Sequence, residues 1–204
     1  RNEWTGSYLC GPTHKELYGQ TIGILGYGRI GKEVAKRAKS FGMNIIACNR
    51  TANKKDPFVD ELMPMEELSN LLERSDFVLL ALPLEEDTVG IIGSKELQQI
   101  GETGVIINVA RGGLIDEESL YIACREKIIS GAIIDTWYNY PMGSSTMHKP
   151  SRFEFNLLDN VIMTPHSSAW TENLIPRRCK KIAINLDKIF NNEKPINMIR
   201  GPIK

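Results

Sequence analysis

A glycine-rich turn between a short apolar run and a helical pattern constrains the fold of this chain more than any other feature. The run TIGIL (21–25) is followed at once by GYGRIG, and the helical pattern of residues 30–42 begins inside that turn. In such a unit Gly26 permits the tight turn, Gly28 lets the backbone approach a pyrophosphate, and Gly31 lets the helix pack on the strand. The helix N-terminus then faces the phosphates. The turn therefore predicts a dinucleotide site, and the alternative is a purely structural glycine turn.

Further apolar runs alternate with segments of helical periodicity along the rest of the chain. The runs cover residues 44–47, 77–81, 104–109, 131–135 and 160–164, and the helical segments cover 65–75, 116–127 and 171–190. Strands that are apolar on both faces, each followed by a helix, indicate a parallel sheet that is covered on both sides. We therefore expect an α/β fold of the Rossmann type, with a doubly wound parallel sheet in a single domain.

We expect the dinucleotide-binding domain to span residues 19–190. Residues 1–18 lack strong periodicity and are interpreted as a connector from a substrate domain that is absent from this sequence. Residues 191–204 are interpreted as the return segment to that domain. Residues 142–155 carry Gly, Ser and Pro without periodicity, which predicts a long loop near the strand ends, where function tends to collect.

The composition excludes several classes of partner. Lys plus Arg (25) equals Asp plus Glu (25), so no net field favours nucleic acid or an anionic membrane. The longest apolar stretch, residues 77–84, is far shorter than the ~20 residues that span a bilayer. The four cysteines show no metal-type spacing, so we predict no metal site and expect free thiols, Cys48 and Cys124 being buried. Free thiols indicate a cytoplasmic protein.

The residues after the second apolar run bear on which dinucleotide is bound. An acidic residue about 20 positions beyond the glycine turn usually grips the adenine ribose of NAD. Asn49 occupies that place here, and Arg50, Thr51, Lys54 and Lys55 follow. An uncharged side chain beside a cation suits a 2′-phosphate, which a carboxylate would repel. We predict that NADP(H) is preferred over NAD(H), the alternative being a solvated basic turn that tolerates both cofactors.

Two side chains just past strand ends are candidates for chemistry. Arg111 follows the run that ends at residue 109, where its planar fork can face a carboxylate in the crevice of an open α/β sheet. His166 follows the last run, after Pro165, and can exchange a proton with a hydroxyl or carbonyl oxygen. The alternatives are a structural cap contact for Arg111 and a structural histidine.

Five stretches carry a resemblance to a known family. They are GYGRIGKEVAKRAKSFGM, SDFVLLALPLEEDTVGIIG, GVIINVARGGLIDEESL, SGAIIDTW and NVIMTPH. In order and spacing they resemble the NAD(P)-binding domain of the D-isomer-specific 2-hydroxyacid dehydrogenases, with glyoxylate/hydroxypyruvate reductase-like members nearest. The resemblance implies a hydride moved between a nicotinamide ring and C2 of a small 2-oxo or 2-hydroxy acid, with the protein supplying position and a proton.

The resemblance also implies roles for single residues. Arg111 matches the arginine that binds the substrate's carboxylate and carbonyl, His166 the general acid/base, and Asp135 the aspartate that holds the nicotinamide carboxamide. Further positions expected to contact the cofactor are Tyr27, Arg29, Ile30, Leu82, Pro83, Val109, Ala110 and Ser168. Trp137 and Trp170 flank this site, and they either exclude water from the nicotinamide or belong to the core.

The position expected to hold the carboxylate partner of the histidine carries a tyrosine. In the family a glutamate usually stands five residues after the aspartate that Asp135 matches, and that position is Tyr140. A phenol is neutral at pH 7, so it can hydrogen-bond an imidazole but cannot stabilise imidazolium as a carboxylate does. Because the formate dehydrogenase branch carries glutamine there, we interpret Tyr140, or Tyr138, as a neutral orienting partner of His166. Alternatively, Tyr140 packs in the loop and another acid, such as Glu154, takes the role.

The resemblance finally implies how the whole protein works. We expect a homodimer joined through this domain, acting as a 2-oxoacid reductase, with a chain that binds dinucleotide but turns over poorly without the substrate domain. The helical segment 171–190 is expected to expose apolar surface meant for that domain. The alternatives are a dinucleotide-sensing binding protein, like the corepressors on the same fold, and a formate-type dehydrogenase of a small acid.

Overall fold

The computed structural model describes residues 15–51, 56–141 and 149–198, which form two compact units that divide between Pro165 and His166. Lys54 and Lys55, which the basic-turn prediction included, lie outside the described residues, as do residues 142–148 of the expected loop. Within the described ranges, no helix is both long enough and apolar enough to cross a bilayer.

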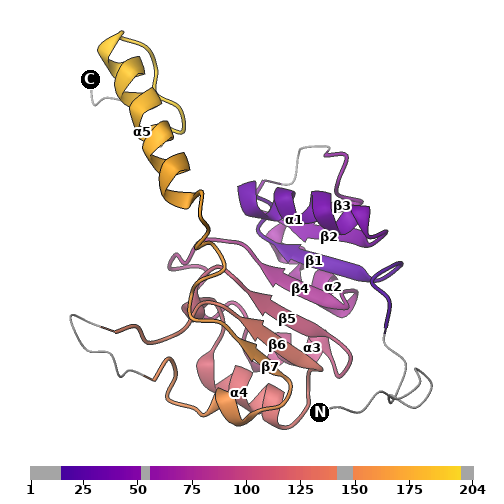
Figure 1. Cartoon of the computed structure of the whole chain (residues 1–204). Helices are drawn as coiled ribbons and strands as arrows, with labels where there is room; N and C mark the ends of the chain where they lie inside the picture. The colour runs from indigo at the N-terminus through magenta and orange to yellow at the C-terminus, as the bar shows by residue number, and fades with distance from the viewer. Residues whose placement is uncertain (1–14, 52–55, 142–148, 199–204) are drawn as a thin grey trace, which may run out of the picture. The chain divides into compact units, whose positions relative to one another are not determined.

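A seven-stranded parallel sheet forms the centre of the first unit (Figure 1). The strands in chain order are β1 (Thr21–Leu25), β2 (Asn44–Cys48), β3 (Glu61–Met63), β4 (Phe77–Leu80), β5 (Val105–Asn108), β6 (Gly131–Ile134) and β7 (Val161–Met163). Their order across the sheet is β3-β2-β1-β4-β5-β6-β7. The chain thus leaves β1 toward one edge and then crosses to β4 and runs toward the other edge. This is the Rossmann-type doubly wound sheet that the sequence predicts, and its switch point lies between β1 and β4.

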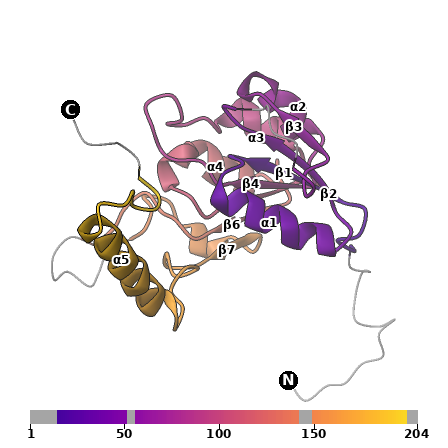
Figure 2. The same ribbon diagram turned by 90° about the horizontal axis from the view of Figure 1, so that it is seen from above.

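Helices cover both faces of the sheet (Figure 2). The helix α1 (Arg29–Ser40) lies on one face, where its Ala35 packs in a core with Ile24 of β1 and Ala47 of β2. On the other face lie α2 (Leu68–Glu73), α3 (Ser94–Ile100) and α4 (Glu117–Arg125), which contribute Leu71, Leu97 and Leu120 to a larger core. Short 3-10 turns at Met65–Glu67, Gly112–Leu114 and Phe155–Leu157 complete the unit. The expected helices therefore form, and α3 is an additional one.

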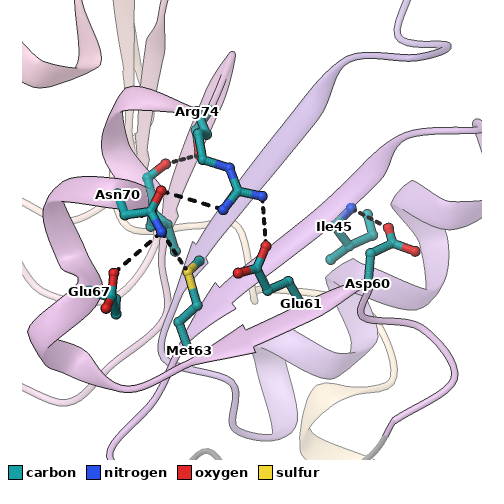
Figure 3. A network of polar contacts seen from close by, with 9 residues as sticks. Ile45, Asp60, Glu61, Met63, Glu67, Asn70 and Arg74 are labelled. Carbon is teal, nitrogen blue, oxygen red and sulfur yellow. Dashed lines mark hydrogen bonds and ion pairs between the residues drawn. The ribbon is translucent and has the colours of Figure 1, made fainter.

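The edge strand β3 is also absent from the sequence-based expectation. It contains three residues and begins with Glu61, so it shows no apolar run. Polar contacts hold it in place instead (Figure 3). Arg74, the residue after α2, donates to Glu61 at 2.6 Å, Asn70 of α2 contacts the sulfur of Met63 at 3.6 Å, and the Asp60 carboxylate accepts a backbone N–H of β2 at 2.8 Å. The strand thus depends on its neighbours rather than on its own composition.

The second unit contains α5 (Leu174–Phe190), which begins three residues later than the helical pattern suggests. None of its residues is buried, and the exposed apolar side chains along it are Ile175, Ile182, Leu186, Ile189 and Phe190. The chain then folds back, since the Asn185 side chain hydrogen-bonds both the N–H and the carbonyl of Ile196. The expected exposed apolar surface is confirmed, whereas the domain that would cover it stays a prediction.

Candidate functional site

The glycine turn has the geometry that each glycine was predicted to allow. Gly26 has a φ of +99°, a value that side chains strongly disfavour. A Cβ on Gly31 would lie 2.4 Å from the Gly26 carbonyl oxygen, so α1 can pack on the turn only through glycine. Gly28 is exposed, and a Cβ placed on it would meet no atom within 4 Å. The turn therefore leaves open space at Gly28, in front of the α1 N-terminus, where an anion would be favoured.

Asn49 connects this turn to the one after β2. Its side-chain oxygen accepts the Tyr27 N–H at 3.3 Å, and its amide nitrogen donates to the Thr51 carbonyl at 3.2 Å. The Tyr27 side chain is 5% exposed, and burial, with nearby Asp56, raises its pKa. Tyr27 can therefore meet a cofactor only through its backbone, whereas Arg50 and Thr51 are exposed.

Two adjoining pockets extend from the glycine turn across the strand ends. The first, of about 500 Å³, is lined by Gly26, Gly28, Asn49, Arg50, Met65, Glu66, Leu68, Ala81, Leu82, Pro83, Asp87, Thr88 and Ile91. The second, of about 360 Å³, is lined by Ile30, Ala81, Leu82, Pro83, Leu84, Val109, Ala110 and Arg111. Because they share three residues, we treat them as one strand-end groove. The groove brings together most of the residues predicted at the cofactor.

One wall of the groove was not anticipated from the sequence. Met65, Glu66 and Leu68 come from the 3-10 turn and the first residue of α2. The polar contacts that fix β3 also hold this segment, because Asn70 contacts both Met63 and Glu67 (Figure 3). The edge strand and its polar network therefore serve to place a wall of the groove.

The turn that carries Arg111 is fixed by a buried amide. Asn108, 1% exposed, donates from its side chain to the Arg111 carbonyl at 2.8 Å and accepts the Ala110 N–H at 3.0 Å. Gly112 follows, and a Cβ there would lie 2.4 Å from the Trp137 carbonyl oxygen, so the turn lies directly against the chain after β6. Sequence analysis missed Asn108. The available signal was a polar residue in an otherwise apolar strand.

Asp135 directly follows β6 and is 3% exposed. Its carboxylate accepts a hydrogen bond from the Thr164 hydroxyl at 2.6 Å, and its N–H donates to the Asn108 carbonyl at 3.0 Å. Hydrogen bonds of this kind lower the cost of burying a carboxylate. Thr164 is a second residue that sequence analysis missed.

Tyr140 lines a third hollow, of about 360 Å³, which we call the tryptophan pocket. Its lining residues are Trp137, Asn139, Tyr140, Pro141, Pro150, Met163, Thr164 and Pro165. The Tyr140 hydroxyl accepts the Trp137 N–H at 3.1 Å, and the Trp137 indole donates to the Thr164 carbonyl at 2.9 Å. Trp137 is buried and packs edge-on against Phe155, so it belongs to the core and also forms a wall of the pocket.

The other candidates for a partner of the histidine have different surroundings. Burial, with smaller contributions from Glu117 and Asp116, raises the pKa of Tyr138, which keeps that phenol neutral. Glu154 forms an ion pair with Lys149. Neither residue lines the tryptophan pocket. Tyr140 therefore stays the best candidate on the first unit.

His166 is the first residue of the second unit and follows β7 by three positions. Its φ is +56°, which is uncommon for a residue with a side chain and is found preferentially at functional sites. Ser168 and the 75% exposed Trp170 belong to the same unit. The pairing of His166 with Tyr140 and the approach of Ser168 to a cofactor therefore stay predictions.

The cysteines of the described chain are free, as expected. Burial raises the pKa of Cys48 to about 11 and that of Cys124 to about 12, which suppresses their thiolates. Across the residues that the structure describes, no group of three or more His, Cys, Asp or Glu side chains could hold a metal ion.

Comparisons with known proteins agree with this geometry. A family model described as "D-isomer specific 2-hydroxyacid dehydrogenase, NAD binding domain" matches residues 1–168. A D-3-phosphoglycerate dehydrogenase of Methanocaldococcus jannaschii is 38% identical over 205 residues, which cover 99% of this chain and 36% of the relative. A glyoxylate reductase of Thermococcus gammatolerans is 37% identical over 190 residues, which cover 92% of this chain and 54% of the relative.

A solved structure shows the same fold. The NAD-complexed D-isomer specific 2-hydroxyacid dehydrogenase of Lactobacillus delbrueckii ssp. bulgaricus superposes with a TM-score of 0.80 at 27% identity. The match covers 92% of this chain and 58% of that protein. The chain therefore spans about half the length, or less, of the relatives it matches.

Proposed function

Because the chain belongs to the D-isomer-specific 2-hydroxyacid dehydrogenase family, through the NAD-binding domain, we propose that it serves hydride transfer between NAD(P)H and a small 2-oxo or 2-hydroxy acid. The observation that carries this proposal is the strand-end groove, which runs from the open space at Gly28 to Arg111. A groove of this kind can hold a dinucleotide with its reactive end beside a carboxylate-binding arginine.

Each proposed role follows from chemistry that the side chain can perform. The α1 N-terminus at Gly28 receives the pyrophosphate, and Asp135 accepts hydrogen bonds from the nicotinamide carboxamide. Arg111 binds the substrate's carboxylate with its fork, and His166 donates a proton to the C2 oxygen during reduction. The bound cofactor supplies the hydride. The relatives named as glyoxylate reductases favour the reductive direction.

The experiment that tests this proposal joins the chain to the remaining part of the Thermococcus gammatolerans glyoxylate reductase. We expect glyoxylate-dependent oxidation of NADPH, and at least a hundredfold loss in Arg111→Ala, roughly the effect of removing a charged contact to the transition state. Arg125→Ala is the matched control, because Arg125 pairs with Glu126 on the surface of α4. A chimera that binds cofactor but reduces no 2-oxo acid would contradict the proposal.

Tyr140 keeps a second candidate function open, a dinucleotide-sensing binding protein, because the usual carboxylate is replaced. A chimera that binds cofactor without reductase activity would favour the sensing protein, and for an active chimera the Tyr140→Glu variant tests the orienting role of Tyr140. For an enzyme we expect the fall in reductase activity with pH to occur at lower pH in the unsubstituted chimera than in Tyr140→Glu, since only a carboxylate favours imidazolium. Coincident pH–rate profiles would remove the orienting role of Tyr140.

We further propose that NADP(H) is the preferred cofactor. Asn49 is uncharged, and Arg50 is exposed at the edge of the groove, where its guanidinium can reach a 2′-phosphate. Affinity for NADH that equals or exceeds affinity for NADPH, measured by titrating the chain, would contradict this preference.

Our proposals on assembly and location rest on smaller observations. Ile107, Ile133 and Ile162 stand in register on β5, β6 and β7, and Ile162 is 60% exposed. An apolar row at a sheet edge is suited to a homodimer interface, and a monomer in sedimentation at micromolar concentration would count against it.

The buried free thiols Cys48 and Cys124 support a cytoplasmic location.

A further inference from the structure

We propose that Glu85 is a positioning residue that lowers the affinity for NADPH relative to NADH, because it holds the Arg50 guanidinium in an ion pair that a 2′-phosphate must break. The inference rests on the proposed function, since it takes the strand-end groove to be the cofactor site. It goes further by naming an acidic residue that opposes NADPH binding.

In the ion pair, both terminal nitrogens of Arg50 face the two carboxylate oxygens of Glu85. Arg50 Nη1 lies 2.8 Å from Glu85 Oε2, and Arg50 Nη2 lies 3.4 Å from Glu85 Oε1. The two residues are 35 positions apart and follow β2 and β4, the strands that flank β1 on its two sides. The pair therefore links the segments that follow the two neighbours of β1, and it occupies the same Arg50 donors that a phosphate would use.

The Glu85 backbone is fixed by hydrogen bonds, and Arg50 has the more exposed side chain of the pair. The Thr88 hydroxyl, which is largely buried, accepts the Glu85 N–H at 2.7 Å. The Glu85 carbonyl accepts the N–H groups of Thr88 and Val89 at 2.9 and 3.1 Å. The Arg50 side chain is 63% exposed and can turn away into solvent or toward a ligand. Breaking the pair thus means moving Arg50 rather than the turn that carries Glu85.

Binding of a phosphate in the first pocket of the groove depends on Arg50, because of the other charges that line this pocket. Of the described residues that line this pocket, Arg50 is the only basic one, and Glu66 and Asp87 are acidic. A 2′-phosphate would meet carboxylates unless Arg50 compensates them. The ribose hydroxyls of NADH carry no charge and can bind with the ion pair intact. The cost of releasing Arg50 from Glu85 therefore falls on NADPH alone.

The expected size of the effect is modest. Side-chain exposure is 63% for Arg50 and 45% for Glu85, so solvent screens the pair. Exposed ion pairs contribute little free energy, so releasing Arg50 from Glu85 should change the affinity for NADPH by roughly two- to fivefold.

The test measures dissociation constants of NADPH and NADH for the full chain by calorimetry, together with the melting temperature of each variant. In Glu85→Gln we expect NADPH to bind roughly two- to fivefold more tightly and NADH to bind as before. Glu86→Gln is the matched control, because it removes the same charge from the neighbouring exposed residue, whereas the ion pair with Arg50 is formed by Glu85. An unchanged NADPH/NADH ratio in Glu85→Gln, or an equal change in Glu86→Gln, would overturn the inference.

The same substitution made in an Arg50→Gln variant shows whether Glu85 acts through Arg50. In Arg50→Gln we expect weaker NADPH binding, and adding Glu85→Gln should then change nothing. The same gain in the Arg50→Gln background would mean that the Glu85 charge repels phosphate directly, which overturns the positioning role. Failure of the proposed function has a different signature. A wild-type chain that prefers NADH contradicts the proposed preference but leaves the shift in Glu85→Gln as support, whereas a chain that binds neither cofactor overturns both.

Discussion

The strand-end groove and the proposed catalytic end of the sheet, where Asp135 follows β6 and His166 follows β7, are both built from turns after parallel strands, but they differ in what completes them. The lining residues of the groove all belong to the first unit, and backbone geometry at Gly26 and Gly31 shapes it. The catalytic end takes Asp135 and Tyr140 from the first unit and His166 from the second. Cofactor binding can therefore be a property of one unit, whereas the proton transfer that we propose would use residues from two.

The largest expected effect concerns Gly31 and Gly28 of the glycine turn. In Gly31→Ala the new Cβ would lie 2.4 Å from the Gly26 carbonyl oxygen. We expect unfolding to become easier by about 1–3 kcal/mol, because packing that is already full must shift. Urea denaturation measures the change.

Gly28→Ala is the matched control for that variant, because its Cβ would meet no atom within 4 Å. We expect its stability to stay within about 0.5 kcal/mol of the wild type, as for other surface substitutions. Equal destabilisation by both substitutions would mean that the turn is not shaped as described.

The next effect concerns the catalytic end. Thr164→Val removes the hydroxyl that donates to the buried Asp135 carboxylate at 2.6 Å. We expect a loss of about 1–3 kcal/mol in the free energy of unfolding, since the buried acceptor loses a partner. Denaturant titration at neutral pH measures it.

Thr136→Val serves as the control for the catalytic end. Within the described residues its hydroxyl is buried without a hydrogen-bond partner, so the substitution should be neutral or stabilising. If Thr136→Val costs as much as Thr164→Val, the hydrogen bond to Asp135 is not what stabilises this end.

The smallest effect is a pH dependence at Asp60, which directly precedes β3 at the amino end of that strand. The Lys39 ammonium, and then the Ile45 N–H, lower the pKa of Asp60 below its ordinary value of 3.8. A lowered carboxyl pKa contributes stability that is present above the ordinary value and is lost as pH falls through the folded-state value. Asp60→Asn should therefore be slightly less stable than wild type at pH 7, by less than about 1 kcal/mol. The difference should shrink as the pH falls below 3.8.

Unfolding of both proteins followed between neutral and acid pH measures this dependence, with the exposed Asp159→Asn as the control. A difference that stays constant across that range would show that the ion pair does not stabilise this end of β3.

The parts of the molecule that the sequence predicts are those that local patterns determine. Six strands follow from apolar runs, and the glycine turn, Arg50 and Arg111 follow from their places after strand ends, whereas Leu82 follows from the family resemblance. The strand β3 and the helix α3 are short, with three and seven residues, and β3 depends on contacts with α2. No local pattern distinguishes either of them.

The contacts made by Asn108, Thr164 and Glu85 were missed for a different reason. Thr164 and Glu85 bind residues 29 and 35 positions away, which only the assembled sheet brings close. Asn108 acts over two and three positions, but its role depends on being buried. Sequence reasoning thus identifies which strand ends carry the chemistry, and tertiary structure identifies what holds them.

The most direct test of the account is a set of amide NMR spectra of the chain recorded while NADPH is added, with Gly28→Ala as the folded control. We predict saturable shifts that are concentrated at the glycine turn, Arg50 and the turn before Arg111, and that Gly28→Ala weakens at least tenfold, since its Cβ occupies the space of the pyrophosphate. Spectra of a folded chain that do not change with NADPH or NADH would contradict the account, and an interaction protein on a dehydrogenase fold would then be the better explanation.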